Sequence, residues 1–168
     1  FTKDAYALDY LADLLPNGKK TPLYKVLVKE KKLTSSARAM NMAQELTGAF
    51  NISVTANPGV SLKEVENAIF EAFDMFEKEG FTEEDLTRIK AKNETSFYGN
   101  FSGILMKSFT IGLYQMFKND PGFYASDFDN AQSVTMEDVK MAYEKYIKGK
   151  NYVSTSFVPK GEVSLIAE

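Results

Sequence analysis

The chain has 168 residues, of which 44% are hydrophobic and 26% charged, so it is long enough for one domain with a sizeable core. A formal net charge of −3 argues against a nucleic-acid-binding protein, which would show a basic surface. No apolar run approaches the ~20 residues of a membrane span. The absence of cysteine fits the cytoplasm and the periplasm equally.

Histidine is absent as well as cysteine. This excludes a Ser-His-Asp triad, a Cys-His dyad and a histidine-based zinc site. The acidic residues are scattered along predicted helices without EF-hand spacing, and we interpret them as solvated faces. A carboxylate site for magnesium or calcium stays open on composition alone. The sequence therefore predicts no catalytic residue and no metal ligand in this chain.

Two helices are predicted at the start of the chain. Leucines at helical spacing indicate a helix from about Lys3 to Leu15, which Pro16-Asn17-Gly18 ends. A second helix is expected from Pro22 to about Lys31, with Thr21 as its cap. Its apolar residues are assigned to the core and its charged run, Lys29 to Lys32, to solvent.

A β-hairpin is expected next. The segment from Phe50 to Asn57 alternates apolar and polar residues, as a half-buried strand does. The preceding segment, Ser35 to Leu46, has helical propensity, but we predict a strand because its neighbour needs a partner. Gly48 lies between the two segments and is assigned to the turn.

The second half of the chain reads as helices followed by one strand. Capping patterns at Ser61, Thr82 and Thr135 predict three helix starts, and a shorter helix is expected around Ala125 to Ala131. The β-rich segment from Asn151 to Pro159 is predicted to be a third strand. This order of elements predicts an α+β domain in which helices pack on one face of a single antiparallel sheet.

One aromatic series in the long helical region is open to two interpretations. Core packing is expected, and the alternative is an exposed patch that docks a neighbouring domain. The series comprises Phe97, Tyr98, Phe101, Phe109, Tyr114 and Phe117.

The ordered series of residues resembles a known domain from about Asp4 to Gly161. The series begins with the leucine-rich helix before Gly18 and continues through Pro22-Leu23-Tyr24, Gly48-x-Phe50-x-Ile52, Ala56-x-Pro58-Gly59 and Gly80-Phe81-Thr82-x-x-Asp85-Leu86. It is similar to the C-terminal-type, non-zinc domain of the pitrilysin/insulinase family of zinc metallopeptidases, the inverzincins. That family includes the mitochondrial processing peptidases.

The resemblance implies a metallopeptidase-like fold and a role that depends on other domains. Such domains pair into two halves that close around a chamber, and zinc is held by an H-x-x-E-H helix whose glutamate is the general base. This chain lacks that motif, so zinc is expected in the parent protein and no cofactor in this chain. Because the chain starts on Phe1, residues 1–168 are expected to be a single non-zinc domain, a fragment of a larger multi-domain chain.

The resemblance also implies two positions where such a domain can act on substrate. Some family members supply an arginine and a tyrosine, seven positions apart, from the partner half. Here these positions hold Val28 and Ser35, and neither side chain can replace the missing group. The chain is therefore interpreted as the second domain of the zinc-bearing half.

Three polar residues are the remaining substrate-contact candidates. Asn51, Ser53 and Thr55 alternate on one face of the predicted hairpin, where they would line the chamber or simply face solvent. We expect a non-catalytic, substrate-confining domain of a zinc metalloendopeptidase. The expected partners are a peptide substrate and neighbouring peptidase domains of the same polypeptide or of a partner subunit, with no nucleic acid and no membrane span.

Two alternatives stay open. The first is a catalytically inactive structural or regulatory subunit of the same family that acts as an assembly partner. The second is an unrelated α+β binding module. For localisation, the bacterial periplasm is slightly favoured over the cytoplasm.

Overall fold

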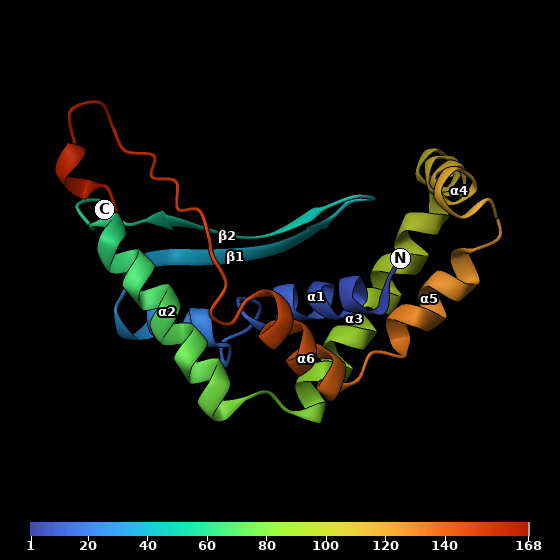
Figure 1. Ribbon diagram of the computed structural model, residues 1–168, viewed down its shortest axis with the longest axis horizontal. Helices are drawn as coiled ribbons and strands as arrows, with labels where there is room; N and C mark the ends of the chain where they lie inside the picture. Colours follow the sequence, from blue (N-terminus) through green and yellow to red (C-terminus); the bar gives the residue numbers. More distant parts are fainter. Residues whose placement is uncertain (168) are drawn as a thin grey trace.

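The computed structural model of the chain describes residues 1–167. Its elements are α1 (Lys3–Leu14), the π-helix η1 (Tyr24–Glu30), β1 (Thr34–Ala43), β2 (Gly48–Ala56), α2 (Leu62–Glu79), α3 (Glu83–Ser102), α4 (Ile104–Lys118), α5 (Tyr124–Gln132), α6 (Met136–Tyr146) and the 3-10 turn η2 (Val163–Leu165). Figure 1 shows the two strands lying over α1, with α2 near one end of the sheet and α3, α4 and α5 near the other. The predicted α+β class with an antiparallel sheet is confirmed.

The helix α1 lies at the centre of the core. Thr2 caps it by accepting a hydrogen bond from the Ala5 N–H at 3.2 Å. Its apolar face contacts β1, α3, α5 and α6, and Leu11 and the following Leu15 are completely buried. The core therefore forms around one helix that contacts one strand and three other helices.

The sheet consists of the β1–β2 hairpin within the described residues. The strands pair from Ala37 opposite Val54 to Ala43 opposite Gly48, with an irregularity between Thr34 and Ala37. The strand predicted at Ser35 to Leu46 is confirmed, because pairing with β2 outweighs its local helical propensity. The turn lies before Gly48, which was expected to be part of it. The Gln44 N–H donates to the Thr47 carbonyl at 2.9 Å, and Gly48 is the first residue of β2.

The three helix starts predicted at Ser61, Thr82 and Thr135 are confirmed, although the first lacks a complete capping box. Thr82 and Thr135 each begin a helix with a complete capping box, whereas Ser61 caps α2 by accepting from the Lys63 N–H at 3.3 Å without a reciprocal bond. The prediction that Thr21 caps the second helix is wrong. Its hydroxyl donates to the Gly18 carbonyl at 2.7 Å, so it closes the preceding turn instead.

The third strand predicted from Asn151 to Pro159 is also wrong. Within residues 1–167, no backbone group of residues 151–158, called the C-terminal segment below, forms a backbone hydrogen bond, and Figure 1 draws this segment as a long coil. Its first aromatic residue turns toward α2, where Tyr152 packs on Phe70 at 5.3 Å between ring centroids and its hydroxyl lies 3.4 Å from a Glu66 carboxylate oxygen. The segment therefore contacts α2, and among residues 1–167 it pairs with neither strand of the sheet.

The aromatic series expected in the core is largely outside it. Of its six members only Tyr114 is buried, and its hydroxyl donates to the Asp127 carboxylate at 2.6 Å. The Tyr6 hydroxyl donates to the same carboxylate, which joins α1, α4 and α5. The helix α4 packs mainly on α3, beyond the reach of α1, so its other side is left uncovered.

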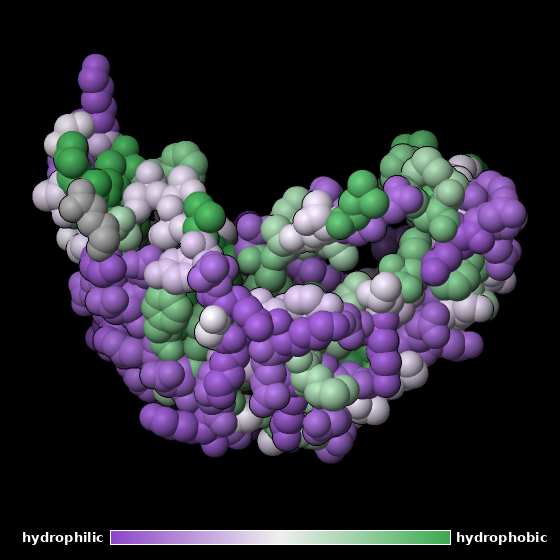
Figure 2. All heavy atoms as spheres, in the orientation of Figure 1, coloured by the Kyte–Doolittle hydropathy of each residue, from purple (hydrophilic) through white to green (hydrophobic). Residues whose placement is uncertain are grey.

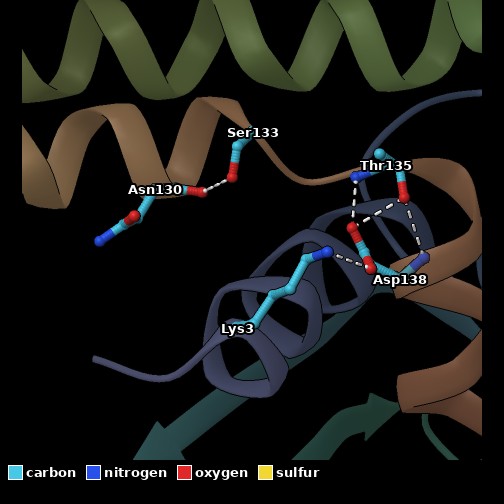
Figure 3. Close-up of polar contacts among 5 residues, drawn as sticks. All are labelled: Lys3, Asn130, Ser133, Thr135 and Asp138. Carbon is cyan, nitrogen blue, oxygen red and sulfur yellow. Dashed lines mark hydrogen bonds and ion pairs between the residues drawn. The ribbon is translucent and has the colours of Figure 1, made fainter.

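The first turn of α6 is fixed to α1 by one buried carboxylate (Figure 3). Asp138 is 7% exposed, and one of its oxygens accepts from the Thr135 N–H at 2.9 Å and the Thr135 hydroxyl at 2.7 Å. Its other oxygen pairs with the Lys3 ammonium at 2.8 Å. Just before this turn, the Ser133 hydroxyl donates to the Asn130 carbonyl at 2.8 Å and closes α5.

These contacts set the protonation of Asp138. Burial is the largest single influence and raises its pKa, but the bonds from Lys3 and Thr135 together lower it more, so the net pKa lies below the ordinary value. The folded protein therefore gains stability from the ionised carboxylate above the ordinary aspartate pKa. That gain is lost as the pH falls through the lowered pKa.

We expect Asp138→Asn to lower the free energy of unfolding at pH 7 by about 1–2 kcal/mol, because the helix cap and the ion pair are both weakened. The matched control is Glu137→Gln, which changes an exposed acid in the same turn and should alter the free energy of unfolding by at most ~0.5 kcal/mol. Urea unfolding at neutral and acidic pH measures both. The difference in unfolding free energy between the wild-type chain and Asp138→Asn should become smaller below about pH 4. Equal losses of unfolding free energy in Asp138→Asn and Glu137→Gln would contradict this account.

Candidate functional site

The outer face of the hairpin carries the three predicted contact residues. Asn51, Ser53 and Thr55 lie on β2 and are all exposed, whereas the residues between them are partly buried against the core. Alternation along the strand is therefore as the sequence predicted, and the structure brings the three side chains onto one face. We call this face, together with its β1 members, the open sheet face.

The β1 members of the open sheet face were missed from the sequence. Arg38 lies opposite Ser53 and Met40 opposite Asn51, while the Asn51 amide nitrogen lies 3.2 Å from the Met42 sulfur. Residues directly opposite in an antiparallel pair share a face, so these side chains adjoin the predicted ones. The register of the hairpin, once counted from its turn, is the signal that could have identified them.

The open sheet face lies on the hollowed side of the molecule. Figure 1 shows the strands spanning the space between the C-terminal segment and α4, and Figure 2 shows a concave surface on that side. The helix α1 packs on the opposite face of the sheet, where the Asn41 amide donates to the Ala5 carbonyl at 3.1 Å. Helices thus support the sheet from one side and leave the other accessible.

The chemistry of this face suits binding. Asn51, Ser53 and Thr55 offer hydrogen-bond donors and acceptors, and the methionines of β1 offer adaptable apolar surface. Arg38 is the one charged side chain among the members of the face. A hydroxyl becomes a nucleophile only beside a general base, and the chain supplies no histidine for that role. The arrangement can hold an extended polar chain, and it offers no group to cleave one.

The two positions assigned by resemblance lie away from this face's centre. Val28 lies on the π-helix η1 and is partly buried. Ser35 is exposed in the irregular start of β1, where the neighbouring Thr34 hydroxyl donates to the Thr55 carbonyl at 2.6 Å. The structure brings η1 and β1 into contact.

A second hollow of about 380 Å³ lies between α2 and α6, on a different part of the surface. Its central acid is Glu77, which accepts from the Tyr143 hydroxyl at 2.9 Å and pairs with the Lys148 ammonium at 2.7 Å. The Lys148 hydrogen bond is the main cause that lowers the Glu77 pKa; burial opposes it and the Tyr143 bond adds to it. Both Glu77 carboxylate oxygens are engaged, so this acid joins α2 to α6 and to Lys148.

The described part of the chain contains neither a metal-binding cluster nor a membrane-spanning helix. Within residues 1–167 no group of three or more acidic, histidine or cysteine side chains is arranged to hold a metal ion. Zinc in proteins is held largely by histidine and cysteine, and this chain supplies neither. No helix among the same residues combines the length and apolar character needed to cross a membrane.

Comparison with known proteins identifies relatives of the chain. Over 98 residues it is 31% identical to the zinc protease PqqE of Helicobacter pylori, covering 58% of this chain and 22% of that protein. A Bordetella pertussis protein of known structure shares the fold at 20% identity with a TM-score of 0.80, over 94% of this chain and 86% of that one. The inactive peptidase domain of a Bordetella parapertussis protein has a TM-score of 0.72 at 20% identity, over 84% and 76% of the two chains.

The matches also show how much of a relative the chain covers and which family it belongs to. The chain spans about a fifth of the length of the curated relative. The family described as the peptidase M16 inactive domain matches residues 2–93, more than half of the chain. This agrees with the resemblance found in the ordered series of residues from Asp4 onward. The chain belongs to the peptidase M16 inactive-domain family.

Proposed function

We propose that this chain is a non-catalytic domain of a longer zinc endopeptidase, called the parent protein below, and that residues 1–168 form one domain of it. Its open sheet face would form part of the wall of a chamber in which a peptide is confined. Zinc and the general base would come from an H-x-x-E-H domain elsewhere in the parent protein or in a partner subunit. The relation to a zinc protease supports this assignment.

One observation carries the proposal. The sheet is covered by helices on one face and bare on the other, and the bare face holds hydrogen-bonding side chains without catalytic groups. Contacts of this kind would be weak and would depend on shape, so the open sheet face would bind peptides of many different sequences. A chamber that encloses unfolded peptides requires walls of this character.

A neighbouring domain would dock on α4. Its uncovered side, the α4 face, consists of Ile104, Leu105, Met106, Phe109, Met116 and Phe117, all exposed. An apolar surface of this kind on one helix is typical of an interaction site. The helix carries Lys107 and Lys118 and no acidic residue, so its partner would present an apolar surface with acidic residues at its border.

The alternative is an inactive structural or regulatory subunit of the same family. The residues Val28 and Ser35 are compatible with it, because they lack the groups with which a partner half would reach the substrate. If the chain instead lies in the zinc-bearing half, as its second domain, no such groups are needed. An intact H-x-x-E-H motif in the parent protein supports the protease, and a degenerate motif supports the subunit.

We expect the 168-residue chain to bind no stoichiometric zinc and to cleave no peptide, because it has no histidine or cysteine ligand. The parent protein should bind one zinc per active half and lose peptide hydrolysis on treatment with a chelator. Metal analysis and a quenched fluorescent peptide measure both, with a parent variant lacking the zinc-binding histidines as control. Chelator-sensitive hydrolysis by the chain alone would refute the assignment.

In the parent protein, we expect the triple variant Asn51→Ala, Ser53→Ala and Thr55→Ala to raise KM about three- to ten-fold with kcat unchanged. The reason is that hydrogen bonds made equally to the bound substrate and the transition state are lost. Steady-state kinetics with a peptide substrate measure this change. Thr47→Ala, an exposed polar residue in the hairpin turn, is the matched control. A KM equal to the control's would exclude substrate contact at this face.

We expect Leu105→Ser with Phe109→Ser to leave the unfolding of the 168-residue chain unchanged, because these side chains are 81% and 62% exposed. In the parent protein the same pair should speed proteolysis between domains and lower the thermal midpoint, since a docking surface is lost. The control is Leu46→Ser at the hairpin turn, where the side chain is 95% exposed. An unchanged parent protein would mean that α4 docks nothing.

A further inference from the structure

Arg38 is the only charged residue in the two strands of the sheet. The sequences of β1 and β2 contain no acidic residue and no lysine. Arg38 is exposed, and none of the ion pairs among residues 1–167 includes it. Its guanidinium group is therefore a positive charge on the open sheet face, without an acidic partner in the described part of the chain.

The other arginine of the chain shows the more usual arrangement. Arg88 lies on α3, and its guanidinium nitrogen lies 3.7 Å from a carboxylate oxygen of Asp85, one turn earlier. Arg38 forms no such pair within residues 1–167, so its N–H donors can serve a ligand. The planar guanidinium group suits a carboxylate, because it can donate two parallel hydrogen bonds to the two oxygens.

Neutral hydrogen-bonding groups surround Arg38 on the sheet. Ser53 lies directly opposite Arg38 in the ladder, and Asn51 and Thr55 lie two residues to either side of Ser53 on the same face. Side chains that are directly opposite in an antiparallel pair have Cβ atoms about 4.5–5.5 Å apart. Hydroxyl and amide groups can donate to the same carboxylate that a guanidinium group binds. The open sheet face therefore combines one positive charge with neutral donors, which favours an anionic group over a cationic one.

The spacing of these side chains matches the repeat of an extended peptide. Side chains on one face of a strand recur every two residues, or about every 6.8 Å. Polar groups recur at this interval on β2, and Arg38, Met40 and Met42 recur at the same interval on β1. Met40 is 55% exposed and Met42 is 43% exposed, so both offer adaptable apolar surface. A peptide lying along the hairpin would meet a positive charge first and apolar surface at the next two alternate positions.

We propose that the open sheet face selects extended peptides that carry an acidic residue, and that Arg38 determines this preference. The carboxylate accepts hydrogen bonds from the guanidinium group and from Ser53, and apolar side chains two and four residues away lie on Met40 and Met42. This inference rests on the proposed function, because it names the class of peptide that the chamber wall would hold. An exposed ion pair gives only a modest preference, so peptides of other sequences still bind.

Peptide binding tests the inference without any measurement of hydrolysis. The parent variant lacking the zinc-binding histidines is titrated with two fluorescent peptides of about ten residues, blocked at both ends and differing only in a central Glu or Gln. Fluorescence anisotropy should give a Kd about two- to five-fold lower for the Glu peptide, and high salt should reduce the difference. Arg38→Gln should abolish the difference, whereas Arg88→Gln, the matched control, should retain it. Arg38→Glu should make a Lys peptide bind more tightly than the Glu peptide.

The results that overturn the inference also show whether the proposed function fails with it. Equal Kd values for the Glu and Gln peptides, with binding still weakened by the triple variant of Asn51, Ser53 and Thr55, would exclude selection by Arg38 and leave the chamber wall intact. Equal values that the triple variant does not change would refute both. A preference that persists in Arg38→Gln would place the carboxylate elsewhere. Tighter binding of a Gln peptide with a free C-terminus than of the blocked Glu peptide would assign the contact to a terminal carboxylate instead.

A second comparison tests the position of the peptide along β1. Peptides with Leu or Ser two residues from the Glu, on each side in turn, should show tighter binding of the Leu peptide on one side. Met40→Ser should reduce that advantage about two-fold or more, because the leucine loses apolar contact. The matched control is Met141→Ser on α6, where the side chain is 51% exposed. Equal effects of the two substitutions would overturn the placement of the peptide on β1.

Discussion

Burial of the apolar face of α1 is the interaction on which the rest of the structure depends. This helix contacts β1 on one side and α3, α5 and α6 on others, and its residues Leu11 and Leu15 have no exposed surface. Each such leucine contributes about 1.5–3 kcal/mol relative to exposure. Polar contacts then fix its neighbours in place: Asp138 joins α6 to Lys3, and Asp127 joins α5 and α4 to Tyr6.

This central helix makes the domain asymmetric. Because α1 occupies one face of the hairpin, the opposite face is free to carry Asn51, Ser53 and Thr55 beside Arg38 and Met40. An exposed antiparallel face of this kind tolerates polar side chains and retains a rigid backbone beneath them. The domain thus presents a firm surface for contact, and its sequence contains neither histidine nor cysteine for bond-breaking chemistry. That division suits an inactive domain of a peptidase family.

The surface is unusual in two further places. The α4 face and the C-terminal segment both expose large apolar side chains, which a domain folding by itself would bury. Both are held by specific contacts at one side: α4 through Tyr114 and the C-terminal segment through Tyr152. Each is therefore positioned, and each has one side uncovered.

Several features could be predicted from particular residues. Leucines at helical spacing predicted α1, capping pairs at Thr82 and Thr135 predicted α3 and α6, and alternation from Phe50 to Asn57 predicted β2 and its polar face. The strand β1 was predicted from the need of β2 for a partner, against local propensity. All of these are signals that lie within about a dozen residues of each other in the sequence. Local spacing is sufficient for them because helix and strand periods are local properties.

Tertiary structure alone decided the rest. The composition of Asn151 to Pro159 predicts a strand, but a strand forms only beside a partner, and Tyr152 turns this segment toward α2 instead. The aromatic residues of α3 and α4 have core-like spacing, yet those of α3 pack on α5 at the surface, and Phe109 and Phe117 of α4 stay exposed. The opposition of Arg38 and Ser53 required the register of the hairpin. Periodicity in the sequence states which side of an element is apolar, and only the packing of elements decides what, if anything, covers that side.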